Sequence, residues 1–178
     1  MKFIDLAEAR QSCRAYDARR EVERDKLNRI AEAARLAPSA CNSQPWHIIT
    51  VTDPEKRTDV ADALASMGMN RWAGQAAAYM VIVQESPNFT ARLGGWVKNK
   101  HFPLIDCGIV ASFITLAATD EGLGSCILGW FEEKRLRRVL GVPRGKRILM
   151  VVSLGYAAED HREHVRHSLS EIHSYESY

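Results

Sequence analysis

The sequence predicts one domain in which helices and strands alternate, and three observations support this fold class. The chain has 178 residues, of which 46% are apolar and 26% charged, so it can bury a sizeable core without disulfide bridges. Four short apolar runs have the composition of strands. The segments between them repeat apolar residues at helical spacing, and by pattern alone this alternation favours a parallel α/β sheet. We treat residues 1–178 as a single domain.

The first half of the chain contains three predicted helices and two predicted strands. A short helix is expected to begin at Asp5, because an acid three residues later completes capping-box spacing. A second helix covers residues 25–37, and a proline ends it. Residues 47–52 and 78–84 are rich in β-branched or apolar residues and are expected to be buried strands. The helix between these strands starts after Asp53, which precedes a proline as an N-cap.

The second half begins with an irregular stretch. Residues 85–103 contain prolines and glycines and are expected to be either a lid or a plain surface connection. Residues 104–122 are apolar around most of a helix circumference, which indicates a central helix and suggests a subunit interface. Residues 125–128 are a predicted strand, residues 132–140 a charged amphipathic helix, and residues 147–155 a strand at the centre of the sheet.

A polar tail occupies residues 156–178 and contains three histidines at a spacing of three, His161, His164 and His167. Metal binding by these histidines is disfavoured, because no carboxylate or cysteine accompanies them in a clear ligand pattern. The tail is either a basic solvated extension or a segment that packs on a partner subunit. A capping box begins at Ser168.

Charge and cysteine content exclude several classes of protein. A net charge of +2 gives no indication of nucleic-acid binding. The apolar runs are expected to be too short or too interrupted to span a bilayer, so no membrane association is expected. Cysteines occur singly, which argues against a zinc or iron-sulfur motif or a disulfide framework and favours a reducing, cytoplasmic location; they are Cys13, Cys41, Cys107 and Cys126.

Two segments are candidate binding sites. Residues 37–46 form a loop bounded by two prolines and rich in hydroxyl and amide groups, which predicts a rigid wall of donors; an ordinary proline-punctuated turn is the alternative. Arg10, Ser12 and Arg14 form a basic cluster with a hydroxyl near the end of the first helix. This cluster could bind a phosphate through charge-assisted hydrogen bonds, or it could be a solvated arginine face.

The sequence lacks the usual motifs of hydrolytic, metal-dependent or nucleotide-binding enzymes. The glycines around Gly122 have no third member and precede a strand, unlike a dinucleotide fingerprint. The segment 141–147 has the wrong spacing for a P-loop, and Arg147 stands where magnesium binding would need a hydroxyl. If the protein is an enzyme, a cofactor is therefore expected to carry the reactivity.

Four motifs together resemble the nitroreductase family of FMN-dependent oxidoreductases. They are residues 9–16 (ARQSCRAY), 37–46 (APSACNSQPW), 106–124 in the central helix and its exit, and 126–131 (CILGWF). The resemblance implies an α+β fold with a mainly antiparallel sheet flanked by helices. It also implies an intertwined homodimer with two FMN sites at the interface, in which residues 156–178 pack on the partner subunit.

The same resemblance implies a role for each site residue. Arg10, Ser12 and Arg166 would bind the FMN phosphate, and Arg14 would lie near N1 and O2 of the ring. The loop would come from the other subunit, with Asn42 on the ribityl chain or ring edge. Asn70 would meet the pyrimidine end, and backbone donors of Leu128 and Gly129 would lie near N5 and O4. The full set of expected cofactor-binding residues is Arg10, Gln11, Ser12, Arg14, Pro38, Ser39, Ala40, Asn42, Gln44, Asn70, Leu128, Gly129 and Arg166.

The implied activity is hydride transfer from NAD(P)H through flavin N5 to a small-molecule acceptor such as a nitroaromatic or a quinone. No side chain is expected to act as a catalytic acid or base, and Arg14 and Gly129 would tune the flavin. His167 falls where compact members often have lysine, which raises the question of its part in phosphate binding. One alternative is a flavin-binding protein for storage or sensing, in which Trp72, Trp96 or Trp130 blocks the nicotinamide face. Another is a domain whose basic ends bind an acidic protein.

Overall fold

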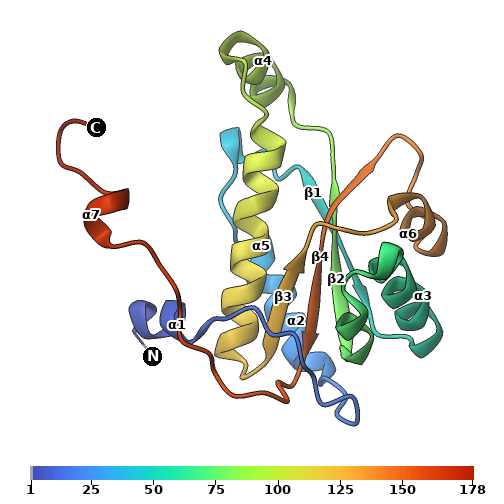
Figure 1. Cartoon of the computed structure of the whole chain (residues 1–178). Helices are drawn as coiled ribbons and strands as arrows, with labels where there is room; N and C mark the ends of the chain where they lie inside the picture. The colour runs from blue at the N-terminus through green and yellow to red at the C-terminus, as the bar shows by residue number, and fades with distance from the viewer. Residues whose placement is uncertain (1) are drawn as a thin grey trace.

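A four-stranded antiparallel sheet forms the centre of the computed structural model, which describes residues 2–178 (Figure 1). The strand order is β1-β2-β4-β3, and every neighbouring pair is antiparallel. The strands are β1 (Trp46–Val51), β2 (Ala78–Gln84), β3 (Gly124–Leu128) and β4 (Arg147–Gly155). The α+β class implied by the resemblance is confirmed, and the parallel sheet favoured by pattern alone is wrong.

The connection between β1 and β2 shows why the alternation of helices and strands predicted the wrong kind of sheet. Val51, at the end of β1, pairs with Tyr79, at the start of β2, so the helical segment between them leaves and re-enters the sheet at the same end of the strands. A parallel pair would need a connection that returns to the opposite end of the strands. Alternation of helices and strands along a sequence does not distinguish these two paths.

Helices cover both faces of the sheet, as Figure 1 shows. On one face lie α2 (Arg24–Arg35) and α5 (Phe102–Asp120), and on the other lie α3 (Pro54–Leu64) and α6 (Glu133–Val139). Strand β2 serves both layers: Met80 and Ile82 belong to the first core, whereas Tyr79 and Val81 belong to the second. This period of two is the reason that β2 reads as a continuous apolar run.

Two helices differ from the sequence predictions. The first helix, α1 (Phe3–Ala9), begins two residues before Asp5, whose carboxylate accepts a hydrogen bond from the backbone N–H of Lys2 at 3.1 Å. Residues 85–103 are not irregular, because α4 (Phe89–Lys98) lies within them. Asn88 caps α4 by accepting from the N–H of Ala91 at 2.9 Å. Two adjacent glycines inside α4 obscured its helical pattern.

Helix α5 is buried on only part of its surface in the single chain. Leu104 and Ile105 near its start are 48% and 54% exposed. Among residues 2–178, α5 is the one helix with the length and composition to cross a membrane, with 19 residues and a mean hydropathy of 1.7. The core helix of a globular protein can have the same length and composition, so this finding does not overturn the expectation that the apolar runs are too short or too interrupted to span a bilayer. In the fold, α5 packs as a core helix against α2 and the sheet.

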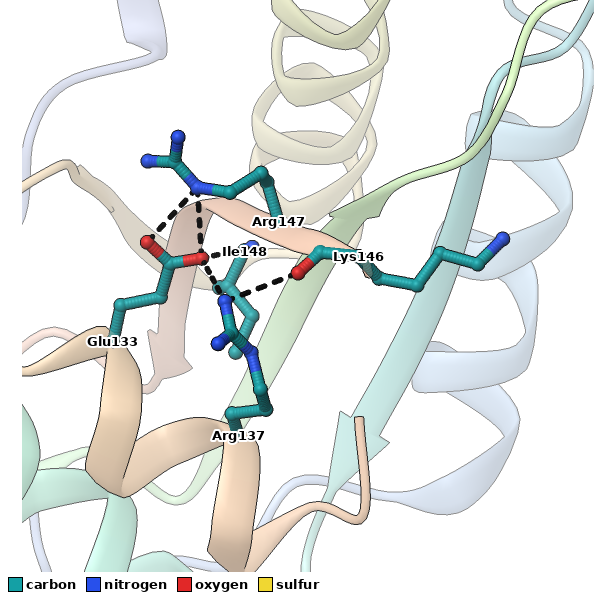
Figure 2. Close-up of polar contacts among 5 residues, drawn as sticks. All are labelled: Glu133, Arg137, Lys146, Arg147 and Ile148. Carbon is teal, nitrogen blue, oxygen red and sulfur yellow. Dashed lines mark hydrogen bonds and ion pairs between the residues drawn. The ribbon is translucent and has the colours of Figure 1, made fainter. Parts of the chain in front are cut away.

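A network centred on Glu133 attaches α6 to the start of β4 (Figure 2). The Glu133 carboxylate accepts from Arg137 Nη2 at 2.9 Å, Arg147 Nε at 3.0 Å and the backbone N–H of Ile148 at 3.1 Å. Arg137 Nη2 also donates to the carbonyl of Lys146 at 3.1 Å. Burial pushes the pKa of Glu133 upward, but its hydrogen bonds and the two arginine charges outweigh this effect and lower the pKa.

The C-terminal tail leaves the sheet and extends away from the rest of the chain (Figure 1). An isolated bridge between Tyr16 and Ala157 marks its departure. It contains the single-turn helix α7 (Leu169–Ile172), which has the expected capping box at Ser168. Apolar side chains of the tail face solvent, including Val165, which is 91% exposed.

Candidate functional site

Residues from the two ends of the chain line one cavity of about 250 Å³. The segment after α1 and the tail meet there, and the lining residues are Arg10, Gln11, Ser12, Arg14, Arg162, Glu163, His164, Val165 and Arg166. The structure therefore brings together five of the residues expected to bind a cofactor, four at the N-terminal end and Arg166 in the tail.

Backbone contacts hold the N-terminal segment against the sheet. Ser12 forms a parallel bridge with Ser125 on β3, and the N–H of Cys13 donates to the Ser125 carbonyl at 2.9 Å. Gly124 permits this approach, because a Cβ at Gly124 would lie 2.7 Å from the Cys13 sulfur. The N-terminal segment therefore lies alongside β3 at the edge of the sheet.

The tail is attached to the same segment by hydrogen bonds. The Gln11 side-chain oxygen accepts from the backbone N–H of Arg162 at 2.9 Å. Glu159 accepts from the backbone N–H of Arg14 at 3.1 Å and also pairs with Arg162. These contacts lower the pKa of Glu159, with the Arg14 N–H as the largest cause. The carboxylate is therefore ionised at neutral pH and holds the two ends of the chain together.

Three guanidinium groups in the cavity are free of carboxylates. Within residues 2–178, Arg10, Arg14 and Arg166 form no ion pair, whereas Arg162 pairs with Glu159. The field of two of these arginines reaches the sheet: burial raises the pKa of Cys126 on β3, while the charges of Arg14 and Arg10 oppose this effect. Glu163 also lines the cavity but forms no ion pair with these arginines, and clustered guanidiniums that form no ion pair favour an anionic ligand.

A second cavity, of about 640 Å³, lies beyond the end of β3. Gly129, Trp130 and Met67 are among its lining residues. The Asn70 side chain lies nearby, because its Nδ2 donates to the Trp130 carbonyl at 3.1 Å. Leu128 is buried at the end of β3. Asn70 and the turn after β3 are therefore neighbours, as the expected shared role at one end of a flavin requires.

The loop after α2 is held in an unusual backbone conformation. Pro38 follows the helix, and a short 3₁₀ turn covers Ala40–Asn42. Cys41, Asn42 and Gln44 have positive φ angles of 51°, 48° and 47°. The backbone N–H of Gln44 donates to Ser39 Oγ at 2.9 Å, and the Gln44 amide donates to Asn42 Oδ1 at 3.1 Å. A left-handed conformation at three residues without a glycine is strained, and other contacts must maintain it.

Three residues outside the loop supply those contacts. Asp106 Oδ1 on α5 accepts from the N–H of Ala40 at 3.1 Å, and the Cys107 thiol lies 3.7 Å from the Pro45 carbonyl. Asn88 donates through Nδ2 to the Cys41 carbonyl at 3.0 Å. Sequence reasoning did not assign these roles. The signal for Asp106 was an acid near the start of a mostly apolar helix, whose other acid, Asp120, is its last residue.

The loop and the arginine cavity lie at different places along α5 in one chain. The loop contacts the N-terminal part of α5 near Asp106, whereas α1 and the segment after it pass the other end of that helix (Figure 1). The cavity that contains Arg10 is lined by the N-terminal segment and the tail. One chain therefore does not bring Asn42 to Arg10.

The tail histidines differ in their positions. His164 lines the arginine cavity, whereas His167 pairs with Glu171 at 3.5 Å. The His161 ring packs against that of His164 at a tilt of 33°, with the ring centroids 5.2 Å apart. Among the residues that the structure describes, no group of three His, Cys, Asp or Glu side chains is arranged to hold a metal ion. The histidine to examine at the anion cavity is His164, which the sequence comparison with compact family members did not single out.

Comparison with known proteins identifies the family. The Nitroreductase family matches this chain over residues 7–82 and 65–156. An oxygen-insensitive NADPH nitroreductase of Helicobacter pylori is 30% identical over 87% of this chain and 90% of its own length. The crystal structure of a nitroreductase family protein from Clostridium difficile 630 has a TM-score of 0.82 and 27% identity, covering 100% of both chains. An FMN-dependent nitroreductase from Clostridium difficile R20291 has a TM-score of 0.77 and 27% identity, covering 98% of this chain and 99% of its own. This chain belongs to the nitroreductase family.

Proposed function

We propose that the protein is an FMN-dependent oxidoreductase that takes hydride from NAD(P)H and passes it to a small-molecule acceptor such as a nitroaromatic or a quinone. Relatives support the cofactor and the donor, since one is named an NADPH nitroreductase and another an FMN-dependent nitroreductase. The observation on this chain that carries the proposal is the cavity containing Arg10, Ser12, Arg14 and Arg166.

The residues of that cavity fit the phosphate of FMN. Three unpaired guanidiniums and a hydroxyl present several donors, and charge-assisted bonds of this kind suit a phosphate dianion. His164 also lines this cavity. A cavity of about 250 Å³ suits the terminal group of the cofactor, so the ring must lie outside it.

When bound, the flavin supplies the hydride chemistry, and this chain supplies position and charge. The backbone at Leu128 and Gly129 would offer donors to N5 and O4 from a turn that Asn70 holds in place. Arg14 would present positive charge near N1 and O2, where negative charge increases on reduction. The cavity beside Gly129 and Trp130 leaves room next to this turn for a substrate.

The site is proposed to be completed in a homodimer. The exposed apolar side chains at the start of α5 need a cover, and a second copy would provide it. The partner would also contribute the loop with Pro38, Ser39, Ala40, Asn42 and Gln44, and residues 156–178 would pack on it. This arrangement would give the strained loop of one chain a place at the arginine cavity of the other.

Storage or sensing without turnover would require an aromatic side chain over the nicotinamide face. Trp72 packs near Tyr16, with ring centroids 6.3 Å apart, and Trp96 lies on the exposed surface of α4. Trp130 is 51% exposed and lines the cavity beside Gly129 without filling it. This arrangement favours an enzyme. We also propose a cytoplasmic location, on the basis of the four unbridged cysteines.

The test combines cofactor extraction with steady-state kinetics. The purified protein is expected to be yellow, to release FMN rather than FAD or riboflavin on denaturation, and to oxidise NAD(P)H in the presence of a quinone or nitroaromatic. Because both substrates would use the same flavin face, double-reciprocal plots are expected to be parallel. A colourless protein that no flavin restores would refute the proposal, and recovery of FAD would refute the cofactor assignment.

A further inference from the structure

The segment that contains α6 and the start of β4 concentrates positive charge. Residues 132–147 contain seven arginines and lysines and two glutamates, whereas the whole chain has a net charge of +2. Four of the seven cations pair with carboxylates and so attach the segment to its neighbours; they are Arg135, Arg137, Lys146 and Arg147. Within residues 2–178, the other three form no ion pair; they are Lys134, Arg138 and Arg144.

All three unpaired cations line one cavity at the end of α6. The cavity has a volume of about 710 Å³, and Glu132, Arg137 and the turn at residues 141–143 complete its lining. Lys134 and Arg138 are four residues apart, so they share one face of the helix. Cations outnumber the single carboxylate in this lining, and their mutual repulsion favours an anion among them.

Capping of α6 does not account for the arginines at this end. Basic side chains often bind the last carbonyls of a helix. In α6, backbone N–H groups occupy those carbonyls: Val142 donates to the carbonyl of Arg137 at 2.9 Å, and Gly141, with a φ angle of 66°, donates to that of Arg138 at 3.4 Å. The Arg138 guanidinium is therefore free for a ligand, on a helix that the Glu133 network holds against β4 (Figure 2).

This cavity borders the one beside Gly129 and Trp130, where a substrate is proposed to bind. Glu132 lines both cavities, and its backbone N–H donates to the Ala63 carbonyl at 3.0 Å, which fixes the boundary between them. Arg138 lies six residues beyond Glu132, about 9 Å along a helix axis. A dinucleotide has two sugars and a pyrophosphate between its bases and is longer than this, so one molecule can occupy both cavities.

We propose that the cavity at the end of α6 binds the 2′-phosphate of the electron donor, and that the enzyme therefore uses NADPH in preference to NADH. Lys134, Arg138 and Arg144 donate to this phosphate, which is the group that distinguishes the two dinucleotides. The phosphate supplies the negative charge that the three cations lack. This assignment rests on the proposed function and specifies its donor.

Steady-state kinetics with both dinucleotides test the assignment. The wild-type holoenzyme is expected to have a higher kcat/KM for NADPH than for NADH. Replacing Arg138 and Arg144 together by glutamine removes two exposed charges, and the ratio of the two kcat/KM values should fall roughly 5- to 20-fold. Added salt should lower the wild-type ratio as well, because it screens exposed charges. Arg24→Gln is the matched control, since Arg24 is an exposed arginine on α2, on the opposite face of the sheet.

Two kinetic results would overturn the assignment while leaving the proposed function intact. A wild-type enzyme that used NADH as well as NADPH would show that the cavity does not select the donor. An unchanged ratio in the Arg138→Gln, Arg144→Gln double variant would show that these cations are only a solvated surface.

A binding measurement decides the assignment without turnover. Adenosine 2′,5′-bisphosphate carries the distinguishing phosphate, and adenosine 5′-monophosphate lacks it. Calorimetry is expected to show tighter binding of the bisphosphate to the wild type and loss of that difference in the double variant. Equal affinities for the two nucleotides would contradict the proposal, and equally tight binding of inorganic phosphate would assign the cavity to free phosphate instead. If the protein oxidised neither dinucleotide, the proposed function would fail, and calorimetry would still decide what this cavity binds.

Discussion

Arg10 and Arg14 lie in the same cavity, but we expect them to act on different parts of the cofactor. Arg10 is proposed to bind the phosphate, whose charge does not change with redox state. Arg14 is proposed to lie near N1 and O2, where charge does change. Two arginines of similar sequence context can therefore be separated by measuring affinity and potential independently.

Replacing Arg14 by glutamine is expected to lower the midpoint potential of bound FMN. A hydrogen bond to a charged group contributes roughly 1.5 to 3 kcal/mol. For a two-electron couple, about 1.4 kcal/mol corresponds to about 30 mV, so a decrease of roughly 30 to 60 mV is expected if most of the contact is specific to the reduced form. Redox titration at saturating FMN measures it. Arg10→Ala is the comparison: it should weaken binding in both redox states and leave the potential nearly unchanged. Equal potentials for wild type and Arg14→Gln would refute the role of Arg14.

Asp106 is a second residue whose effect can be measured alone. Asp106 is only 3% exposed, and one of its carboxylate oxygens accepts a hydrogen bond from the Ala40 N–H. Asp106→Leu removes that acceptor and leaves the N–H of a strained loop unpaired, which is expected to cost about 1 to 3 kcal/mol. Hydrogen exchange should show faster exchange at the Ala40 amide. Asp106→Asn keeps an acceptor oxygen and should retain most of the protection; equal protection in Asp106→Leu would mean that the loop needs no anchor on α5.

At the scale of elements, α6 depends on an ion-pair network to stay at the start of β4. Glu133 accepts from Arg137, Arg147 and the Ile148 N–H, and its side chain is only 23% exposed, so these bonds are partly shielded from water. Since the turn with Gly129 and Trp130 directly precedes α6, this network also positions the second cavity.

Glu133→Gln is expected to lower the free energy of unfolding by about 1 to 3 kcal/mol at neutral pH. The pKa of Glu133 is lowered in the folded protein, so its contribution is present above the unfolded pKa of about 4.3 and is lost as pH falls through the folded pKa. The difference in free energy of unfolding between wild type and variant should therefore shrink as the pH falls through the folded pKa of Glu133. Urea denaturation at several pH values measures it, with Glu132→Gln as the control on an exposed neighbour. A difference that stays constant with pH would exclude an ionic contribution.

At the scale of the whole molecule, the start of α5 is the surface that a second copy is proposed to cover. Leu104 and Ile105 are exposed in the single chain, and a charge placed among apolar side chains of an interface is strongly unfavourable. Dimerisation and flavin binding should then be lost together, because the partner's loop is proposed to complete the site.

Ile105→Glu is expected to shift the protein from dimer to monomer in sedimentation and to reduce FMN retention. Thr58→Glu is the matched control, since it places the same charge on an exposed position of α3, on the opposite face of the sheet. A wild-type monomer that retains FMN would contradict the shared site. So would an Ile105→Glu dimer with unchanged stability.

The sequence by itself determined the features that depend on neighbouring residues. Residues 78–84 were predicted as a strand and form β2, and Asp53 was predicted as the cap of α3, where it accepts from the Lys56 N–H at 3.0 Å. Both depend on local periodicity or capping chemistry. The arginine cluster near Arg10 was visible as a candidate anion site, but its place in FMN binding came from the family resemblance and stays a prediction.

Only the tertiary structure decided which distant residues meet. The antiparallel sheet depends on where the segment between β1 and β2 returns, which no local pattern records. Asp106 reaches the loop, and His164 rather than His167 lines the arginine cavity, because α5 and the tail pass those places in the fold. Side-chain chemistry can be read along the chain, whereas long-range proximity results from packing of the whole core. For that reason the residue types at the site were predictable and their partners were not.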